Sequence, residues 1–229
     1  MNLIPKRHID SAYERELQTL RERLLLMAGR VEAMIRDSAL ALERGDIHLA
    51  ESTIGQDSHV NTDEVEIDEL CLKILARRQP LASDLRTITL TLKMVTDLER
   101  ISDLAVNICE RTIILGDNGK FIPHADIKTM ATSVQAMVRN AIDAFVQRDI
   151  DRANLVISDD DKVDDAFHRV CVSATELMRT DESNVEQGIH IVSIAKHLER
   201  MGDHATNIAE QIVFLVRGKD IRHQGKLAD

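Results

Sequence analysis

Two short segments of this sequence carry pairs of carboxylates at helical spacing. Glu99 and Asp103 stand four residues apart, and Glu199 and Asp203 repeat this spacing one hundred residues later. In an α-helix the positions i and i+4 lie one above the other on the same face, so each pair points the same way. Like charges in this arrangement repel each other, and a cation between them relieves the repulsion. Each pair is therefore a candidate cation ligand set.

Both pairs belong to a longer repeated pattern. Asn107 and Glu110 follow the first pair at the spacing with which Asn207 and Glu210 follow the second, which makes a line on one side of a helix for about three turns. Earlier in the chain the repeat continues with an offset of 103 residues, which pairs 41–47 with 144–150. The chain is thus an internal duplication with a small length difference in one loop.

In the first half of the chain, the helix that precedes the acidic segment supplies further oxygen ligands. Residues equally far from the turn of an antiparallel helical hairpin lie level with each other. Reflection through Pro80 places Asp57 level with Asp103 and Asn61 level with Glu99.

The second half follows the same rule about its own turn near residues 181–182. Here Asp160 is level with Asp203, and Asp164 is level with Glu199. Two independent halves therefore bring the same four positions together, and Asn61 is the neutral counterpart of Asp164.

Oxygen-rich clusters of this kind suit magnesium, calcium, manganese or iron far better than a thiolate-bound metal. Without a metal, the crowded carboxylates raise one another's pKa values. Two alternatives stay open: an imidazole from His168, His197 or His204 adds a ligand, or the acidic line is a solvated face paired with cations such as Arg100 and Arg111.

The elements that position these residues are helices. Apolar residues recur every three or four positions, aromatic residues make up only 2% of the chain, and Gly45-Asp46 and Pro80 mark breaks. The pattern predicts an all-α fold of six long helices, which form two tandem, sequence-related three-helix bundles. We expect the units 1–119 and 120–229, separated by the loop cluster at 116–123, and we expect helices at about 9–43, 47–76, 81–115, 125–147, 150–178 and 184–217.

Composition narrows the function classes. The formal net charge is −10 and no basic stripe offsets it, which argues against nucleic-acid binding. Cys71, Cys109 and Cys171 are isolated and lack C-x-x-C spacing, so we expect reduced thiols. Neither a signal peptide nor a membrane-spanning stretch is recognisable, and we expect a cytoplasmic protein.

Catalysis has little support in the sequence. The chain holds no Glu-x-x-His motif of di-iron bundles, no Walker A loop and no G-x-G-x-x-G turn. No nucleophile stands at a defined spacing from a base. We therefore expect that the protein is not an enzyme. A metal-free helical scaffold is the first alternative to a metal-binding protein, and a metal-dependent enzyme is the less favoured second alternative.

Three segments together resemble the PhoU family of bacterial phosphate regulators. They are QPLASDLR at 79–86, DLERISDLAVNI at 97–108 and HLERMGDHATNIAE at 197–210, and the opening SAYEREL at 11–17 adds to them. The resemblance covers nearly the whole chain, and the combined motifs are specific.

The resemblance implies a fold and a set of ligands. PhoU-like proteins are two tandem three-helix bundles whose acidic motifs can carry multinuclear iron or zinc clusters on the bundle surface. The oxygen donors themselves also suit magnesium or manganese. Carried over by position, the cluster residues are Glu99, Asp103, Glu199 and Asp203. The supporting positions are Asp57, Asn61, Asp160 and Asp164, and the repeated line itself adds Asn107, Asn207, Glu110 and Glu210 to the candidate ligands.

The resemblance also implies partners. PhoU-like proteins act as adaptors between the ATPase subunit of the phosphate ABC transporter and a sensor histidine kinase. They hold the phosphate-starvation response off when phosphate is plentiful, and they restrain phosphate uptake. It further implies a homodimer that meets the membrane only through its partners.

Overall fold

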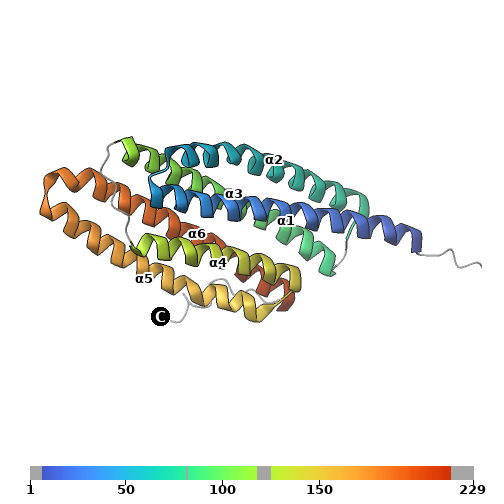
Figure 1. Cartoon of the computed structure of the whole chain (residues 1–229). Helices are drawn as coiled ribbons and strands as arrows, with labels where there is room; N and C mark the ends of the chain where they lie inside the picture. The colour runs from blue at the N-terminus through green and yellow to red at the C-terminus, as the bar shows by residue number, and fades with distance from the viewer. Residues whose placement is uncertain (1–6, 81, 118–124, 218–229) are drawn as a thin grey trace, which may run out of the picture.

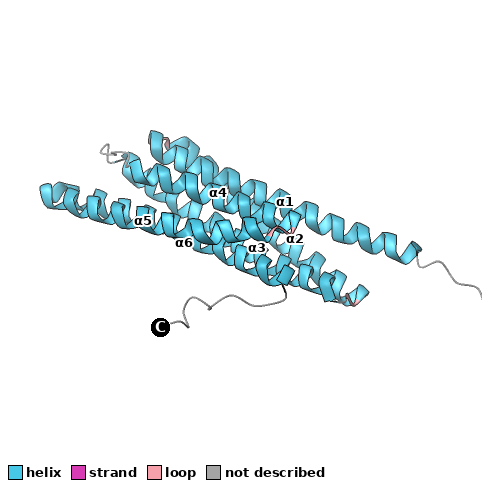
Figure 2. Cartoon of the chain, turned by 90° about the horizontal axis from the view of Figure 1, so that it is seen from below, coloured by secondary structure: helices cyan, strands magenta, loops and turns pink. Residues whose placement is uncertain are grey.

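The chain folds into six α-helices in the part that the computed structural model describes, which is residues 7–80, 82–117 and 125–217 (Figure 1). The helices lie roughly along one direction and form an elongated body, in which all regular structure is helical (Figure 2). Their bounds are α1 Arg7–Arg44, α2 Ile47–Arg78, α3 Ala82–Asp117, α4 Ala125–Gln147, α5 Ile150–Thr180 and α6 Val185–Arg217. This confirms the all-α fold and places every predicted helix within a few residues of its expected position.

The turns after α1 and α4 show the duplication in atomic detail. Gly45 ends α1 with a φ of 61°, and the carboxylate of Asp46 accepts a hydrogen bond from the backbone N–H of Leu49 at 3.0 Å. In the second copy, Arg148 has a φ of 54° and Asp149 caps α5 in the same way. Glycine occupies this left-handed conformation without strain, whereas arginine costs about 1 kcal/mol there.

The ends of the other helices differ in detail from the sequence prediction. Gln79 adopts a left-handed conformation with a φ of 48° and donates its backbone N–H to Leu75 O, so α2 extends to Arg78. A single 3₁₀ turn, Glu182–Asn184, precedes α6. The predicted loop at 116–123 is shorter at its start, because α3 continues to Asp117; positions 118–124, with the expected boundary between the two units, lie outside the described residues.

Each half is a three-helix bundle, and the two bundles share one hydrophobic core. The core cluster contains fully buried side chains from every helix, among them Leu24 of α1, Ile67 of α2, Leu98 of α3, Met130 of α4 and Ile208 of α6. Burial of apolar surface at roughly 25 cal/mol per Å² is the main stabilising term for such a body. The two bundles are therefore joined by packing as well as by sequence.

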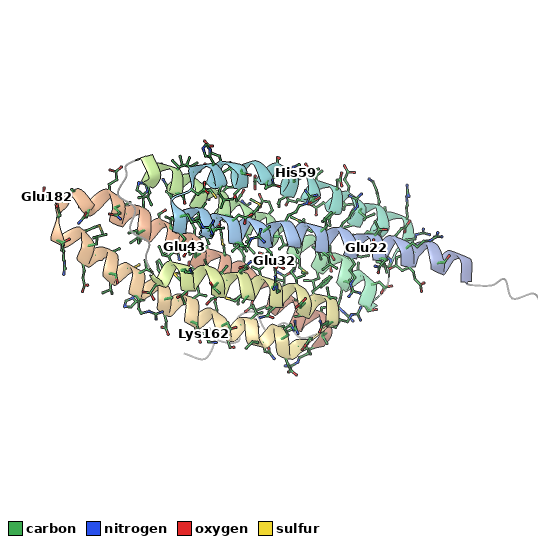
Figure 3. The ribbon with its side chains drawn as sticks, in the orientation of Figure 1. Glu22, Glu32, Glu43, His59, Lys162 and Glu182 are labelled. Atoms are coloured by element: carbon green, nitrogen blue, oxygen red, sulfur yellow. The ribbon has the colours of Figure 1, made fainter. Side chains whose placement is uncertain are left out.

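The two halves pack with a pseudo-twofold arrangement, in which α1 lies against α4 and α3 lies against α6. Along the α1–α4 contact, Arg139 pairs with Glu32 at 3.1 Å and Lys128 pairs with Glu43 at 2.6 Å, so the two helices run antiparallel (Figure 3). α2 and α5 lie on the outside of the pair. The outer face of each α2–α3 and α5–α6 hairpin is thereby left for the acidic residues.

Two further expectations concern the cysteines and the membrane. All three cysteines are free thiols; burial raises the pKa of Cys71 and Cys109 to about 12 and also raises that of Cys171, which makes them poor nucleophiles. Of the helices in the described part of the chain, none has the length and apolar character needed to cross a membrane.

Candidate functional site

The acidic residues of the first half lie across the α2–α3 hairpin. Asp57 of α2 accepts hydrogen bonds from the Ser102 hydroxyl of α3 at 3.1 Å and from the Asn61 amide at 2.8 Å. Asp57 also lies close enough to Glu99 for its charge to raise the pKa of the Glu99 carboxyl. We call Asp57, Asn61, Glu99 and Asp103, together with Glu64, the first acidic row.

Glu64 is a member of this row that the sequence prediction missed. It lies on α2 one turn beyond Asn61, and burial raises its pKa, with Asp68 and Asp103 adding to the shift. The duplication hid this residue, because the equivalent position 103 residues later is Phe167. Its only sequence signal is the spacing of three residues from Asn61, which places both on the same face of a helix.

The second half forms a matching row across the α5–α6 hairpin. Asp160 lies against α6 at Gly202, where a Cβ atom would come within 3.2 Å of the Asp160 carboxylate. Its charge interacts with those of Asp203 and Asp164, and Asp164 in turn interacts with Glu199. We call these four carboxylates, Asp160, Asp164, Glu199 and Asp203, the second acidic row.

Crowding and burial make these carboxyl groups hard to ionise. Burial raises the pKa of Asp160 to about 6, with the neighbouring charges of Asp203 and Asp164 adding to the shift. Burial, followed by the charge of Glu199, raises the pKa of both Asp164 and Asp203. In the first row, burial and then the charge of Asp103 raise the pKa of Glu99. A cation placed at either row would remove this cost.

Each row already has one basic side chain in contact with it. Arg100 lies 3.5 Å from Glu99 and 3.6 Å from Asp103 in the first row. In the second row Lys196 lies 2.6 Å from Glu199, and its ammonium is 5.4 Å from the centre of the Phe167 ring. These pairs are what the alternative of a solvated, ion-paired face requires, although each row keeps more negative than positive charges.

The rows supply oxygen donors without a closed metal cage. Within the described ranges, no three histidine, cysteine, aspartate or glutamate side chains are arranged so that they could hold a metal ion. The predicted metal site therefore stays a prediction. The remaining predicted positions lie one to two turns further along the same two helices: Asn107 and Glu110 on α3, Asn207 and Glu210 on α6.

The three histidines considered as extra ligands have different surroundings. His204 contacts Asp97 of α3, with 3.0 Å between its Nδ1 and the Asp97 carboxylate, so it joins the two halves. His197 lies 3.3 Å from the Ser193 hydroxyl, and burial lowers its pKa, as do the charges of Arg111 and Arg200. His168 is exposed on α5. His204 is thus committed to the contact between α3 and α6.

A surface groove lies away from both rows. It has a volume of about 250 Å³ and is formed where α1, the start of α3 and the end of α4 meet, with Arg21, Asp84 and Arg148 among the residues that line it. Tyr13 donates a hydrogen bond to Asp84 beside it at 3.1 Å.

Comparisons with known proteins identify the fold. The sequence matches the family described as "PhoU domain" twice, over residues 24–112 and 127–212. It is 39% identical over 219 residues to the "Phosphate-specific transport system accessory protein PhoU homolog" of Pseudomonas putida, with 95% of this chain and 86% of that protein covered. The PhoU accessory protein of Escherichia coli K12 is 34% identical over 220 residues, which cover 96% of this chain and 91% of that protein.

Two crystal structures share the architecture. PhoU from Pseudomonas aeruginosa matches with a TM-score of 0.87 and 39% identity, over 90% of this chain and all of that one. The phosphate transport system regulatory protein PhoU from Streptococcus pneumoniae matches with a TM-score of 0.85 and 26% identity, over 91% and 99% of the two chains.

Proposed function

This chain belongs to the PhoU family, and we propose that it is an accessory protein of a phosphate transport system that works by docking and not by catalysis. The proposal is supported by the names of its relatives, which are phosphate-specific transport system accessory proteins. In this role the protein is a negative regulator of the phosphate-starvation response and restrains phosphate uptake.

The partners that fit this role are the ATPase subunit of the phosphate ABC transporter and a sensor histidine kinase. The protein links the two in the cytoplasm, and it meets the membrane only through them. We propose that it does so as a homodimer.

The observation that carries the docking proposal is the open outer surface of the two hairpins. α2 and α5 bury only one stripe each and leave large apolar side chains in solvent. Val65 and Leu72 of α2 are 58% and 60% exposed, and Leu155 and Val172 of α5 are 49% and 47% exposed. Apolar side chains left exposed on the outer helices are available for contacts with another protein.

We further propose that the acidic rows bind metal. The donors are carboxylates, whose chemistry suits iron, magnesium or manganese, and zinc accepts them as well. Glu99 and Asp103 would hold a metal on the first row, with Asp57 and Glu64 beside them. A bound cation would offset much of the negative charge of the row and fix the orientation of α2 against α3, which would present a single rigid face to a partner.

A substitution experiment tests both proposals. The variant carries alanine at Glu99, Asp103, Glu199 and Asp203, and a control variant carries alanine at three exposed acids outside the rows: Glu22, Glu51 and Asp151. Metal content of protein purified without a metal-binding tag is measured by mass spectrometry. Capture of the ATPase subunit and the kinase is measured in parallel, with repression of the phosphate-starvation response as the cellular readout.

The outcomes separate the proposals. Loss of metal, partner capture and repression in the row variant alone supports the metal-coupled adaptor. Unchanged capture and repression in the row variant refutes a role of the rows in docking. Absence of metal from the wild-type protein, with docking intact, favours the metal-free helical scaffold. Turnover of phosphate esters or peroxide by metal-loaded protein would instead favour an enzyme.

A further inference from the structure

The pseudo-twofold contact between α3 and α6 has two sides that hold different residues. Positions 100 apart are equivalent, so each contact on one side of the seam has a counterpart on the other. A polar group that has a hydrogen-bond partner on one side can lack one at the equivalent position on the other side.

On the first side, the carboxylate of Asp97 is held by donors from α6. His204 Nδ1 lies 3.0 Å from one carboxylate oxygen, and Gln211 Nε2 donates to the other at 3.4 Å. Both Asp97 and His204 are largely buried, with side-chain exposures of 14% and 19%. An anion at this place in the seam is thus held between donors from the opposite helix.

On the second side, the counterparts have the opposite character. The equivalent of Asp97 is His197, and the equivalent of Gln211 is Arg111. The guanidinium of Arg111 therefore faces an imidazole on this side, whereas the amide of Gln211 faces a carboxylate on the first side. Arg111 is close to His197, because its charge is one of the two that act on this ring. The second is that of Arg200. The side therefore holds cations and ring nitrogens in place of the carboxylate.

The nitrogens on this second side are buried and unsatisfied. Arg111 Nε, His197 Nδ1 and His190 Nδ1 are each shielded from solvent, with no hydrogen-bond partner among the described residues. Leaving a buried donor unpaired destabilises the folded protein, and the effect is larger for a charged group. The residues that carry these atoms are only half-buried as a whole, so other parts of their side chains lie at the surface.

We propose that a small oxyanion of the phosphate class binds at this second side of the α3–α6 seam, between Arg111 and His197. It supplies on the second side the negative charge that the Asp97 carboxylate supplies on the first. Arg111 supplies charge and N–H donors, His197 donates from Nδ1 while its Nε2 accepts from the Ser193 hydroxyl, and Arg200 adds positive potential. The site does not depend on the proposed adaptor role, and it differs from the acidic rows in sign and in position.

The test measures binding of inorganic phosphate to the full chain by isothermal titration calorimetry, with sulfate as a second oxyanion and chloride at equal ionic strength as the blank. Two variants remove the site. Arg111→Gln installs the residue of the equivalent position 211, and His197→Asp installs the residue of the equivalent position 97, which places a carboxylate beside Arg111 and removes the imidazole. The control, Arg86→Gln, removes an exposed arginine from the opposite side of the same seam.

We expect saturable phosphate binding to the wild-type protein and to Arg86→Gln, and about tenfold or greater weakening in the other two variants, as for the loss of one charge-assisted hydrogen bond. His197→Asp should also melt at a higher temperature than the wild-type protein in phosphate-free buffer, because its carboxylate pairs with Arg111. No saturable response of the wild-type protein overturns the proposal. Equal weakening in Arg86→Gln, or none in Arg111→Gln and His197→Asp, overturns it as well.

Discussion

The charge of Asp160 should destabilise the metal-free protein, so Asp160→Asn should stabilise it at neutral pH. Burial and the neighbouring carboxylates raise the pKa of Asp160 from 3.8 to about 6. One pKa unit corresponds to about 1.4 kcal/mol, so the full shift would cost ~3 kcal/mol at pH 7. Because the side chain is only half-buried, solvent screens part of this cost, and we expect a gain of about 1–2 kcal/mol for the asparagine variant.

The pH dependence follows from the direction of the shift. Below pH 4 the carboxyl is protonated in both the folded and the unfolded chain, so the charge costs nothing. Between pH 4 and pH 6 the unfolded chain loses this proton first, and the folded state loses stability as the pH rises. Above pH 6 the cost is complete. The advantage of Asp160→Asn should therefore appear between pH 4 and pH 6 and stay constant above.

Urea unfolding at several pH values, with EDTA present to remove metal, measures this difference. Asp57→Asn is the matched control in the first half, where the Ser102 hydroxyl and the Asn61 amide donate to the carboxylate. It should destabilise the protein at pH 7 by about 1 kcal/mol, because it weakens these charge-assisted hydrogen bonds. An Asp160→Asn variant that is less stable than the wild-type protein at pH 7, or equally stabilised at pH 4 and pH 7, would refute the reasoning.

Three further substitutions test the fold and the rows. Gly202→Ser should lower the pKa of Asp160, measured by NMR titration of the carboxyl, because the Cβ position lies 3.2 Å from the Asp160 carboxylate and brings a hydroxyl donor to it; an unchanged pKa would contradict this. Gly188→Ala should lower the free energy of unfolding by about 1–3 kcal/mol, because its Cβ would come 2.5 Å from Met178 Cγ; a neutral result would mean that the methionine moves freely. Asp46→Ala should cost about 1 kcal/mol in urea unfolding through loss of the α2 N-cap, and no loss would show that the cap contributes nothing.

Most of the helical architecture was predictable because local rules determine it. Gly45 marks the end of α1 because glycine adopts a positive φ without strain, and Asp46 marks the start of α2 because its carboxylate accepts a backbone N–H. Apolar periodicity defines the buried stripe of each helix. The equal spacing of Asp160 and Asp203 from their turn also predicted correctly that their charges interact. These inferences need only helix geometry and the duplication.

The contact between the halves could not be predicted from the sequence. Periodicity identifies which stripe of a helix is buried, but it does not identify the helix that covers it. Asp97 and His204 lie 107 positions apart, and only the packing of α3 against α6 brings them within 3.0 Å. The unsatisfied nitrogen atoms of Arg111 and His197 become visible only when this packing is known.

The two acidic rows show that the sequence repeat identifies equivalent positions but does not identify every charged residue in a row. Asn61 is neutral where the second half has Asp164, which suggests a weaker first row. The structure places Glu64 in the first row, so the number of carboxylates is restored from a position that the repeat does not mark. The basic side chain that contacts each row also comes from a different position in each half. Arg100 follows Glu99 by one residue, whereas Lys196 precedes Glu199 by three. The two copies have thus kept a similar charge balance with different residues, and only spatial proximity reveals it.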